Sequence, residues 1–280
     1  MTWGSVPPEE SNLGAELALI DWSRDAIVIS HLRTDHYLYL VPLRYGARYR
    51  KKGQERIDVW VPTGGIEHLR LLGACLSTTQ PFFESAFAFH EYVPDSLFTI
   101  GSMVLTAVPV WHSIPAHALR VVASERTFVF SSDTAPCARL DEVATGADLL
   151  LAETTFGTKA YAPGGQLHLG GPDAGRVARV ANARHLVLTH FIPGTDREAV
   201  RHSTMREFDG VVTIARPHLV MTAFPLPHHL VQHVGCAVQE FVEVGAFDHQ
   251  GRCKGHVLVP APRNEPVLAR KGLELLGRLC

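Results

Sequence analysis

The segment AIVISHLRTDH, residues 26–36, decides the fold. Its first half, AIVIS, is apolar and rich in β-branched residues, which is typical of a short buried strand. Its second half, HLRTDH, brings His31, Asp35 and His36 together within six residues, as a metal site requires. Arg33 stands where a further imidazole would complete an alternating H-x-H-x-D-H pattern. Taken alone, the segment fits either a metal site with one ligand replaced or a polar strand end.

Three further apolar strands also end in residues that can bind a metal. TAVPVW (106–111) leads into His112, TFVFSS (127–132) into Asp133, and HLVLT (185–189) into His190. Ligands in α/β proteins gather at the carboxyl ends of strands, and four such strand ends in one chain are difficult to produce by chance. Neutral imidazoles with carboxylates suit zinc, and also manganese or iron. A carboxylate such as Asp133 that could bridge two ions suggests a two-metal hydrolytic centre.

Short apolar runs and segments with helical spacing interleave through residue 222, which predicts a layered α/β domain over residues 1–222. We expect strands at 26–30, 57–61, 97–100, 103–108, 118–122, 127–131, 148–152 and 186–189. We expect helices at 36–50, 65–75, 138–145 and 172–183. Beyond residue 222 the periodicity weakens, so residues 223–280 are expected to form a C-terminal extension, an irregular segment with one helix near 266–279.

The composition favours a soluble cytoplasmic protein. Of its 280 residues, 46% are hydrophobic and 19% are charged, which excludes disorder and a coiled coil as the main description. Lys and Arg number 26 against 28 Asp and Glu, so no general basic field argues for nucleic acid. The five cysteines form no C-x-x-C pair, which favours reduced thiols. No apolar run is long enough to span a membrane, and no membrane partner is expected.

The stretches around the later candidates resemble one known superfamily. SSDTAPCARLDEVATGADLLLAETTF (131–156) is similar to a segment of the form F-x-x-D-T-x-P-C … A-D-x-L-x-x-E, and HLGGPDAGRVARVANARHLVLTHF (168–191) is similar to H-x-x-x-x-x-A-G-x-x-A … L-x-L-x-H. Both segments belong to the ribonuclease Z and arylsulfatase-like phosphodiesterase branch of the metallo-β-lactamase superfamily. The resemblance covers roughly residues 18–222. It implies an α/β fold, the metallo-β-lactamase αββα sandwich.

The resemblance also implies two metal sites that share one carboxylate. The first would be formed by His31, His112 and Asp133, and the second by Asp35, His36, His190 and Asp133. Asp35 and His168 match residues with proton-transfer roles in this branch, and Glu153 matches a carboxylate that would support a ligand imidazole. The implied cofactor is zinc, with manganese or iron as alternatives.

The chain departs from the family pattern in three places. Arg33 cannot ligate a metal, and its charge opposes that of an ion, so we expect one firmly held metal and a second that is weak or absent. Only 30 residues precede His31, so the N-terminal strands are expected to be shortened and to leave an exposed sheet edge. Only residues 113–132 separate His112 from Asp133, which leaves no room for the long arm of tRNA-processing ribonuclease Z enzymes.

The function expected from these features is metal-dependent hydrolysis of a small phosphodiester or related ester by metal-activated hydroxide. A basic stretch, RYGARYRKKGQER (44–56), could contact RNA, but tRNA 3′-processing is the weaker alternative and a solvated surface explains the stretch better. Lactone or thioester hydrolysis shares the fold. The rival class is a catalytically impaired or inactive family member that acts as a binding or structural protein, which Arg33 and the short N-terminus would favour. A homodimer is expected from the resemblance alone.

Overall fold

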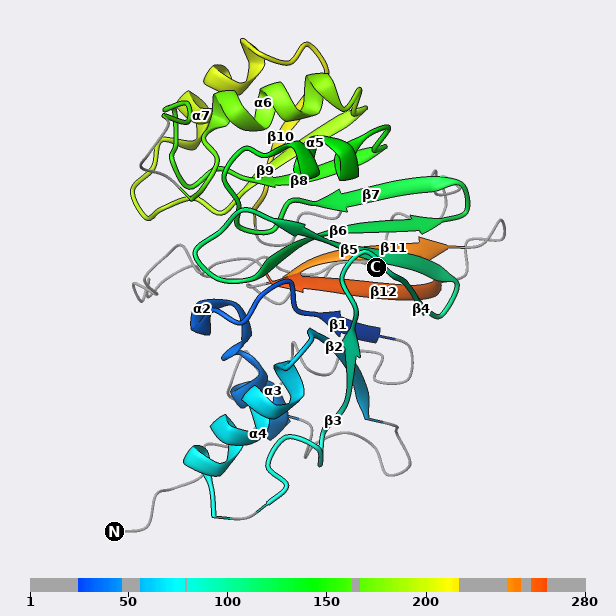
Figure 1. The fold of residues 1–280 in the computed structure, drawn as a ribbon. Helices are drawn as coiled ribbons and strands as arrows, with labels where there is room; N and C mark the ends of the chain where they lie inside the picture. The colour runs from blue at the N-terminus through cyan, green and yellow to red at the C-terminus, as the bar shows by residue number, and fades with distance from the viewer. Residues whose placement is uncertain are drawn as a thin grey trace, which may run out of the picture.

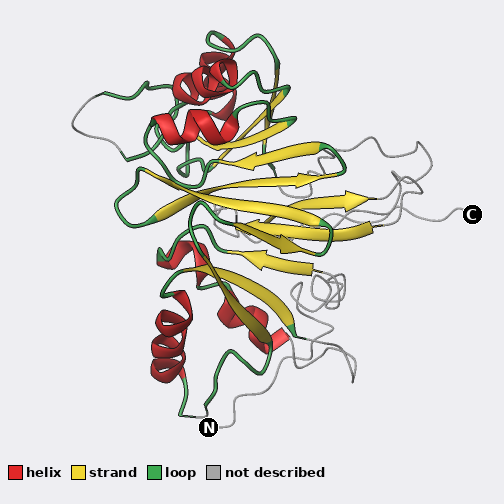
Figure 2. Cartoon of the chain, turned by 45° about the vertical axis from the view of Figure 1, so that its right-hand side comes forward, coloured by secondary structure: helices red, strands yellow, loops and turns green. Residues whose placement is uncertain are grey.

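Two mixed β-sheets lie face to face, with helices on the outer side of each (Figures 1 and 2). The chain is seen in a computed structural model that describes residues 25–46, 56–78, 80–162, 167–216, 241–247 and 253–260, the last two ranges by their backbone. One sheet has five strands in the order β11-β12-β1-β2-β3, and the other has seven in the order β10-β9-β8-β7-β6-β5-β4.

The seven-stranded sheet changes from antiparallel to parallel pairing at β7, because helices separate the strands that follow it. Its strands are β4 (Leu97–Ile100), β5 (Met103–Val110), β6 (Ala116–Ala123), β7 (Arg126–Phe130), β8 (Leu149–Glu153), β9 (His185–Thr189) and β10 (Val211–Ile214). Helices α5 (Ala138–Ala144), α6 (Gly171–Val180) and α7 (Arg197–Met205) follow β7, β8 and β9 in turn. The carboxyl ends of β7, β8 and β9 therefore lie at one edge of the sheet.

The five-stranded sheet is built from both ends of the described chain. Its early strands are β1 (Asp25–Val28), β2 (Ile57–Pro62) and β3 (Phe87–Tyr92), with helices α2 (Thr34–Tyr37), α3 (Leu40–Gly46) and α4 (Gly65–Leu76) between them. Strand β12 (Cys253–Pro260) pairs in parallel with β1, and β11 (Phe241–Phe247) pairs antiparallel with β12. The late strands lie beside β1 in both ribbon views (Figures 1 and 2).

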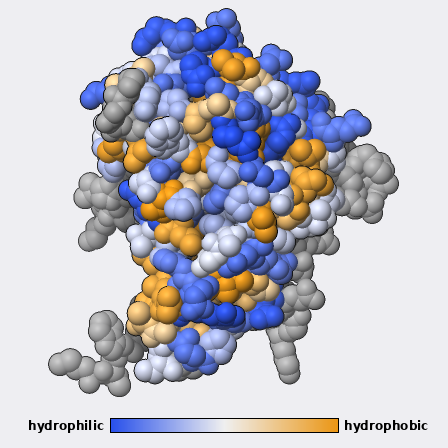
Figure 3. Space-filling model, viewed as in Figure 1, coloured by the Kyte–Doolittle hydropathy of each residue, from blue (hydrophilic) through white to orange (hydrophobic). Residues whose placement is uncertain are grey.

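Three clusters of buried side chains fill the three interfaces of this layered structure. The first joins residues of both sheets, such as Val28 and Leu105, and so lies between them. The second packs the seven-stranded sheet against α5, α6 and α7, and the third packs β1, β2 and β3 against α3 and α4. Hydrophobic and hydrophilic residues are interspersed on the side of the molecule drawn in Figure 3. The predicted αββα sandwich is confirmed.

The predicted strands are all present, with bounds that differ by a few residues. The predicted helix at 36–50 is instead two helices, α2 and α3, separated by a turn at residues 38–39, while residues 47–55 lie outside the described part. Both His36 and Tyr37 of α2 are buried. Strands β3 and β10 and helix α7 were not predicted. The predicted helix at 266–279 lies outside the described residues.

The expected exposed edge beside β1 is wrong, because β12 occupies that edge. The register pairs Asp25 with His256 and Ile27 with Leu258. The segment after residue 222, expected to be irregular, thus contributes two strands to the sheet that carries the first candidate ligands. Among the described residues, no helix is long and apolar enough to cross a bilayer.

Candidate metal centre

The candidate ligands are delivered by strand ends from both sheets. His31 follows β1 and bridges to Ala116 of β6, which ties the two sheets together at this point. His36 lies on α2, while His112, Asp133 and His190 follow β5, β7 and β9. These segments end at the same edge of the sandwich, so ligands that are far apart in the sequence lie close together.

Two residues of the centre adopt a strained backbone. Ser132 has a φ of 58° and His190 a φ of 59°, in the left-handed region that costs a non-glycine residue about 1 kcal/mol or more. His190 directly follows β9, and Ser132 lies two positions after the end of β7. Such strain persists only where the surrounding structure holds it, and here it aims the Asp133 and His190 side chains inward.

Asp133 lies at the middle of the cluster. Its Oδ2 is 3.4 Å from Nε2 of His36, 3.8 Å from Nε2 of His31 and 3.9 Å from Nε2 of His112. Its Oδ1 is 3.4 Å from Nε2 of His190. The carboxylate therefore faces four imidazoles with both oxygens, as a residue that bridges two ions would.

The inward atoms of this cluster have no other partner. Nε2 of His31, His36 and His112 and Oδ2 of Asp133 are buried and without a hydrogen bond among the described residues. A buried polar group left in this way costs about 1–3 kcal/mol, so four together require a common ligand. Potential ligand atoms that lie within 4.8 Å of one another form three groups: His31, His112 and Asp133; His36, Asp133 and His190; and Glu153, His168 and His190. The first two groups share Asp133 and contain the atoms that have no hydrogen bond. Imidazole with carboxylate is a donor set that fits zinc, manganese or iron.

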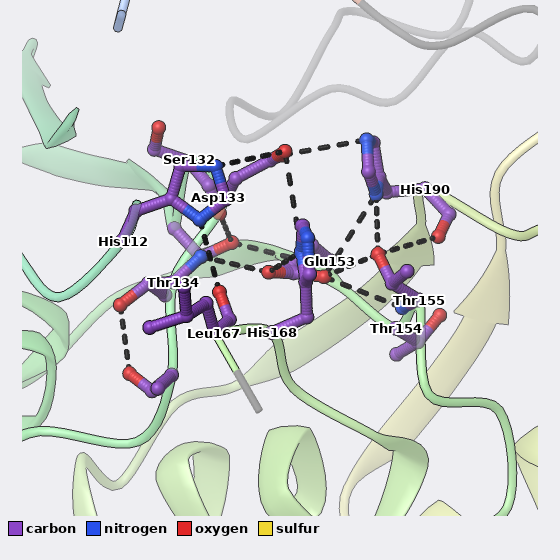
Figure 4. Close-up of polar contacts among 12 residues, drawn as sticks. His112, Ser132, Asp133, Thr134, Glu153, Thr154, Thr155, Leu167, His168 and His190 are labelled. Carbon is purple, nitrogen blue, oxygen red and sulfur yellow. Dashed lines mark hydrogen bonds and ion pairs between the residues drawn. The ribbon is translucent and has the colours of Figure 1, made fainter. Parts of the chain in front are cut away.

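Contacts on the outer side of the rings fix which nitrogen faces inward. Nδ1 of His112 donates to the carbonyl of Leu167 at 3.0 Å, which leaves Nε2 as the acceptor. The Thr155 hydroxyl donates to Glu153 Oε2 at 2.6 Å, and since it has one proton, it accepts from Nδ1 of His190. Figure 4 shows this chain of contacts behind His190. Both imidazoles therefore present a lone pair to the centre.

Electrostatics keep the ligands in the protonation state that metal binding needs. Burial, and then repulsion by His36, lowers the pKa of His31 to about 3. Burial also lowers the pKa of His190. Burial alone would raise the pKa of Asp133, but the close approach of His36 and of the other imidazoles holds it below its ordinary value. At neutral pH His31 and His190 are neutral and Asp133 is ionised, which suits a divalent ion.

The buried Glu153 and the partly buried His168 form a hydrogen-bonded pair beside the cluster (Figure 4). Glu153 Oε1 accepts from Nδ1 of His168 at 2.9 Å and from the backbone N–H of Thr134 at 2.7 Å. Burial would lower the pKa of His168, but the hydrogen bond with Glu153 and the charges of Glu153 and Asp133 raise it overall. The sequence predicts that Glu153 supports a ligand imidazole. In the structure Glu153 hydrogen-bonds to His168 directly and to His190 through the hydroxyl of Thr155.

Asp35 lies apart from both ligand groups. Its side chain is 51% exposed and pairs with Arg33, whose Nε is 3.1 Å from Oδ1. Its other oxygen is 3.7 Å from Nε2 of His36, so it borders the cluster without joining it. The predicted ligand and proton-transfer roles of Asp35 stay predictions.

Sequence reasoning did not identify the groups that hold the ligands in place. They are the Ser30 hydroxyl, 3.0 Å from Nδ1 of His31, together with Thr134, Thr155 and the Leu167 carbonyl. Thr134 and Thr155 lie one and two positions after Asp133 and Glu153, and this proximity was the available signal. No sequence signal marked Leu167, because every residue has a backbone carbonyl.

A largely buried cluster of imidazoles around one carboxylate, at the edge of an αββα sandwich, defines a metal-binding protein. The match to the family model described as "Beta-lactamase superfamily domain" covers residues 18–191. The chain therefore belongs to the metallo-β-lactamase superfamily.

Known relatives agree with this membership. An uncharacterized protein of Mycobacterium leprae is 31% identical over 194 residues, 66% of this chain and 66% of that protein, so the match spans about two thirds of each. The probable metallo-hydrolase YhfI of Bacillus subtilis is 27% identical over 204 residues, 70% of this chain and 78% of that protein. The crystal structure of YhfI matches with a TM-score of 0.61 over 71% of this chain and 78% of that chain. Ribonuclease Z of Acaryochloris marina is 24% identical over 218 residues, 60% of this chain and 68% of that protein.

Proposed function

We propose that this chain hydrolyses a phosphodiester, or a closely related ester, of a small substrate. The observation that carries the proposal is the Glu153–His168 pair beside a cluster of ligands whose inward atoms have no other partner. A ligand cluster alone fits many metal proteins, whereas a neighbouring acid with its own buried carboxylate supplies the proton that ester cleavage needs. The relationship to ribonuclease Z supports a phosphodiester as the bond class.

The metal in this proposal is zinc, with manganese or iron as alternatives. His31, His112 and Asp133 would hold one ion, and His36, Asp133 and His190 the other. Bound divalent ions lower the pKa of water and neutralise charge that develops on phosphoryl oxygens. The chain's own contribution is to orient His112 through the carbonyl of Leu167 and His190 through the hydroxyl of Thr155.

His168 is proposed as the general acid. Glu153 occupies its Nδ1, which leaves Nε2 as the nitrogen that can hand a proton to the leaving alkoxide. The hydrogen bond with Glu153 and the charge of Glu153 raise the pKa of His168 despite burial, so the ring keeps its proton to higher pH than a free imidazole. After transfer, the negative charge of Glu153 favours recovery of the proton from solvent. The ring is 16% exposed, enough for that exchange.

Asp35 is proposed to orient the attacking water. It lies on the exposed side of the cluster, with one oxygen beside His36 and the other beside Arg33. A carboxylate at that border can accept a hydrogen bond from water that enters from solvent.

A small substrate is favoured over tRNA by the short connections between His112 and Asp133. Strands β5 and β6 are joined by residues 111–115, and β6 and β7 by Ser124 and Glu125. Neither connection is long enough to form an arm around a large RNA. The basic stretch at 44–56 lies mostly outside the described residues, so it adds no support for RNA.

The proposal is tested with purified full-length protein loaded with zinc or manganese and offered bis(p-nitrophenyl) phosphate. We expect turnover by the native chain and none by Asp133→Asn, because both ligand groups share that carboxylate. p-Nitrophenyl acetate and a thioester, tested in parallel, would reveal a different ester class by higher kcat/KM. Folded, metal-loaded protein that turns over none of these would refute hydrolysis and favour a non-catalytic binding role.

A further inference from the structure

Arg33 stands at the position of a metal ligand in the first motif, and its position in the structure suggests a role other than metal binding. It precedes α2 with an extended backbone, φ −82° and ψ 137°, so it lies between the two ligands His31 and His36. Its guanidinium reaches back to the cluster, where Nη1 is 3.9 Å from Oδ2 of Asp133. That oxygen is the one that His31, His36 and His112 also face.

The guanidinium is held from two sides and open on a third. Asp35 pairs with Nε at 3.1 Å, and the buried Asp133 attracts Nη1. The side chain is 44% exposed, and within the described ranges its guanidinium forms these ion pairs but no hydrogen bond. A planar fork with free N–H groups, anchored at one edge, is preorganised to bind two oxygens of one anion.

The positive charge of Arg33 beside the ligand cluster also favours a bound anion. An arginine here cannot ligate an ion, and its fixed charge repels one held by His31, His112 and Asp133. A bound anion that lies between the guanidinium and the cluster removes that repulsion. A histidine at this position would supply a ligand, whereas arginine supplies a permanent positive charge at the solvent side.

We propose that Arg33 binds the anionic phosphoryl group of the substrate and so selects charged phosphate esters over neutral esters, a role that rests on the proposed function. Asp35 then acts as a positioning residue that keeps the guanidinium at the border of the cluster.

The test measures binding of inorganic phosphate by titration calorimetry to metal-loaded full-length protein that has been freed of excess metal. Arg33→Gln should weaken phosphate binding by at least about tenfold, or about 1.4 kcal/mol, with metal content no lower than in the native chain and circular dichroism unchanged. Arg33→Lys keeps the charge but loses the fork, so its affinity should lie between the two. Arg70→Gln is the matched control, since Arg70 also pairs through Nε with a carboxylate, Glu84, but lies on α4. It should bind phosphate like the native chain.

Two results would overturn the proposal: native phosphate affinity in Arg33→Gln, or loss of metal together with phosphate in that variant. A substrate comparison separates this failure from that of the proposed function. Arg33→Gln should lower the ratio of kcat/KM for bis(p-nitrophenyl) phosphate to that for p-nitrophenyl acetate. If the native chain hydrolyses the diester and this ratio does not fall, hydrolysis stands and the role of Arg33 fails. If nothing is hydrolysed but phosphate binding depends on Arg33, the anion site stands and hydrolysis fails.

Discussion

Glu153 controls the protonation of His168, and this control depends on its own burial. The carboxylate is fully buried and accepts from Thr134, Thr155 and His168, so its negative charge is stabilised by hydrogen bonds rather than by solvent. A charge placed in this way acts strongly on an adjacent imidazole, since little water screens it. The balance between burial and this charge sets the pH at which His168 loses its proton.

Replacing Glu153 by Gln should therefore shift the pH dependence of hydrolysis. The native pKa of His168 is raised, so acid catalysis is present at low pH and is lost as pH rises through that pKa. Without the negative charge the pKa falls, and the alkaline limb of the profile of kcat/KM against pH should move to lower pH. Turnover at neutral pH should fall about 10- to 100-fold.

Exposed Glu142→Gln serves as the control, because its side chain is 63% exposed and pairs with Arg139. Its pH profile should match that of the native chain. If the activity of Glu153→Gln falls at the same alkaline pH as that of the native chain, His168 is not the acid.

Replacing Arg33 by His should restore a ligand and tighten a second ion. Two unit charges 4 Å apart repel by about 4 kcal/mol at an effective dielectric constant of about 20, so the native guanidinium should leave about one firmly held ion per chain. With a neutral imidazole, metal content after gel filtration should approach about two ions per chain, and hydrolysis should rise. Elemental analysis measures this directly. Two tightly bound ions in the native chain would contradict the expectation, and no gain in the variant would mean that the first site is not assembled.

At the scale of helices and strands, sequence reasoning succeeded where the signal was local. Each predicted strand is a short apolar run with turn residues at its ends, and the candidate ligands follow such runs, so their convergence could be expected. It failed where burial is set by distant partners. Strand β3, FAFHEY, carries His90 and Glu91 on a partly exposed sheet edge, and α7, REAVRHSTM, buries one apolar side chain, Val200. The aromatic residues of β3 do favour a strand, whereas α7 has too few apolar residues for a helical pattern to stand out.

The surroundings of His31 also depend on distant residues that could not be predicted from the sequence. The carbonyl of Ser30 accepts from Nδ1 of His117 at 3.1 Å and from the Tyr92 hydroxyl at 3.2 Å. These donors come from β6 and β3, one from each sheet, and hold the end of β1 in place. His117 had no motif to mark it, since its contribution arises only when the sheets meet. The ligand types could be predicted from sequence, while the scaffold that orients them could not.

For the whole molecule, the decisive feature is that chain segments from opposite ends share a sheet. β12 pairs in parallel with β1, and β1 leads directly to His31. The first ligand therefore depends on a strand more than 200 positions later in the sequence. The domain boundary expected at residue 222 stays a prediction, and this pairing provides a way to test it.

A chain that ends at residue 222 should be less stable and should bind metal more weakly, because it loses β11 and β12 and exposes the backbone of β1. A loss of about 3 kcal/mol would lower the Tm of a domain of this size by roughly 6 to 12 °C. The matched control ends at residue 260 and keeps both strands, so its Tm and zinc content should be close to those of the full chain. Thermal unfolding followed by circular dichroism, with zinc measured on the same samples, separates the two. If the shorter chain keeps the native Tm and zinc content, residues 1–222 form an autonomous domain and the late strands do not support the metal centre.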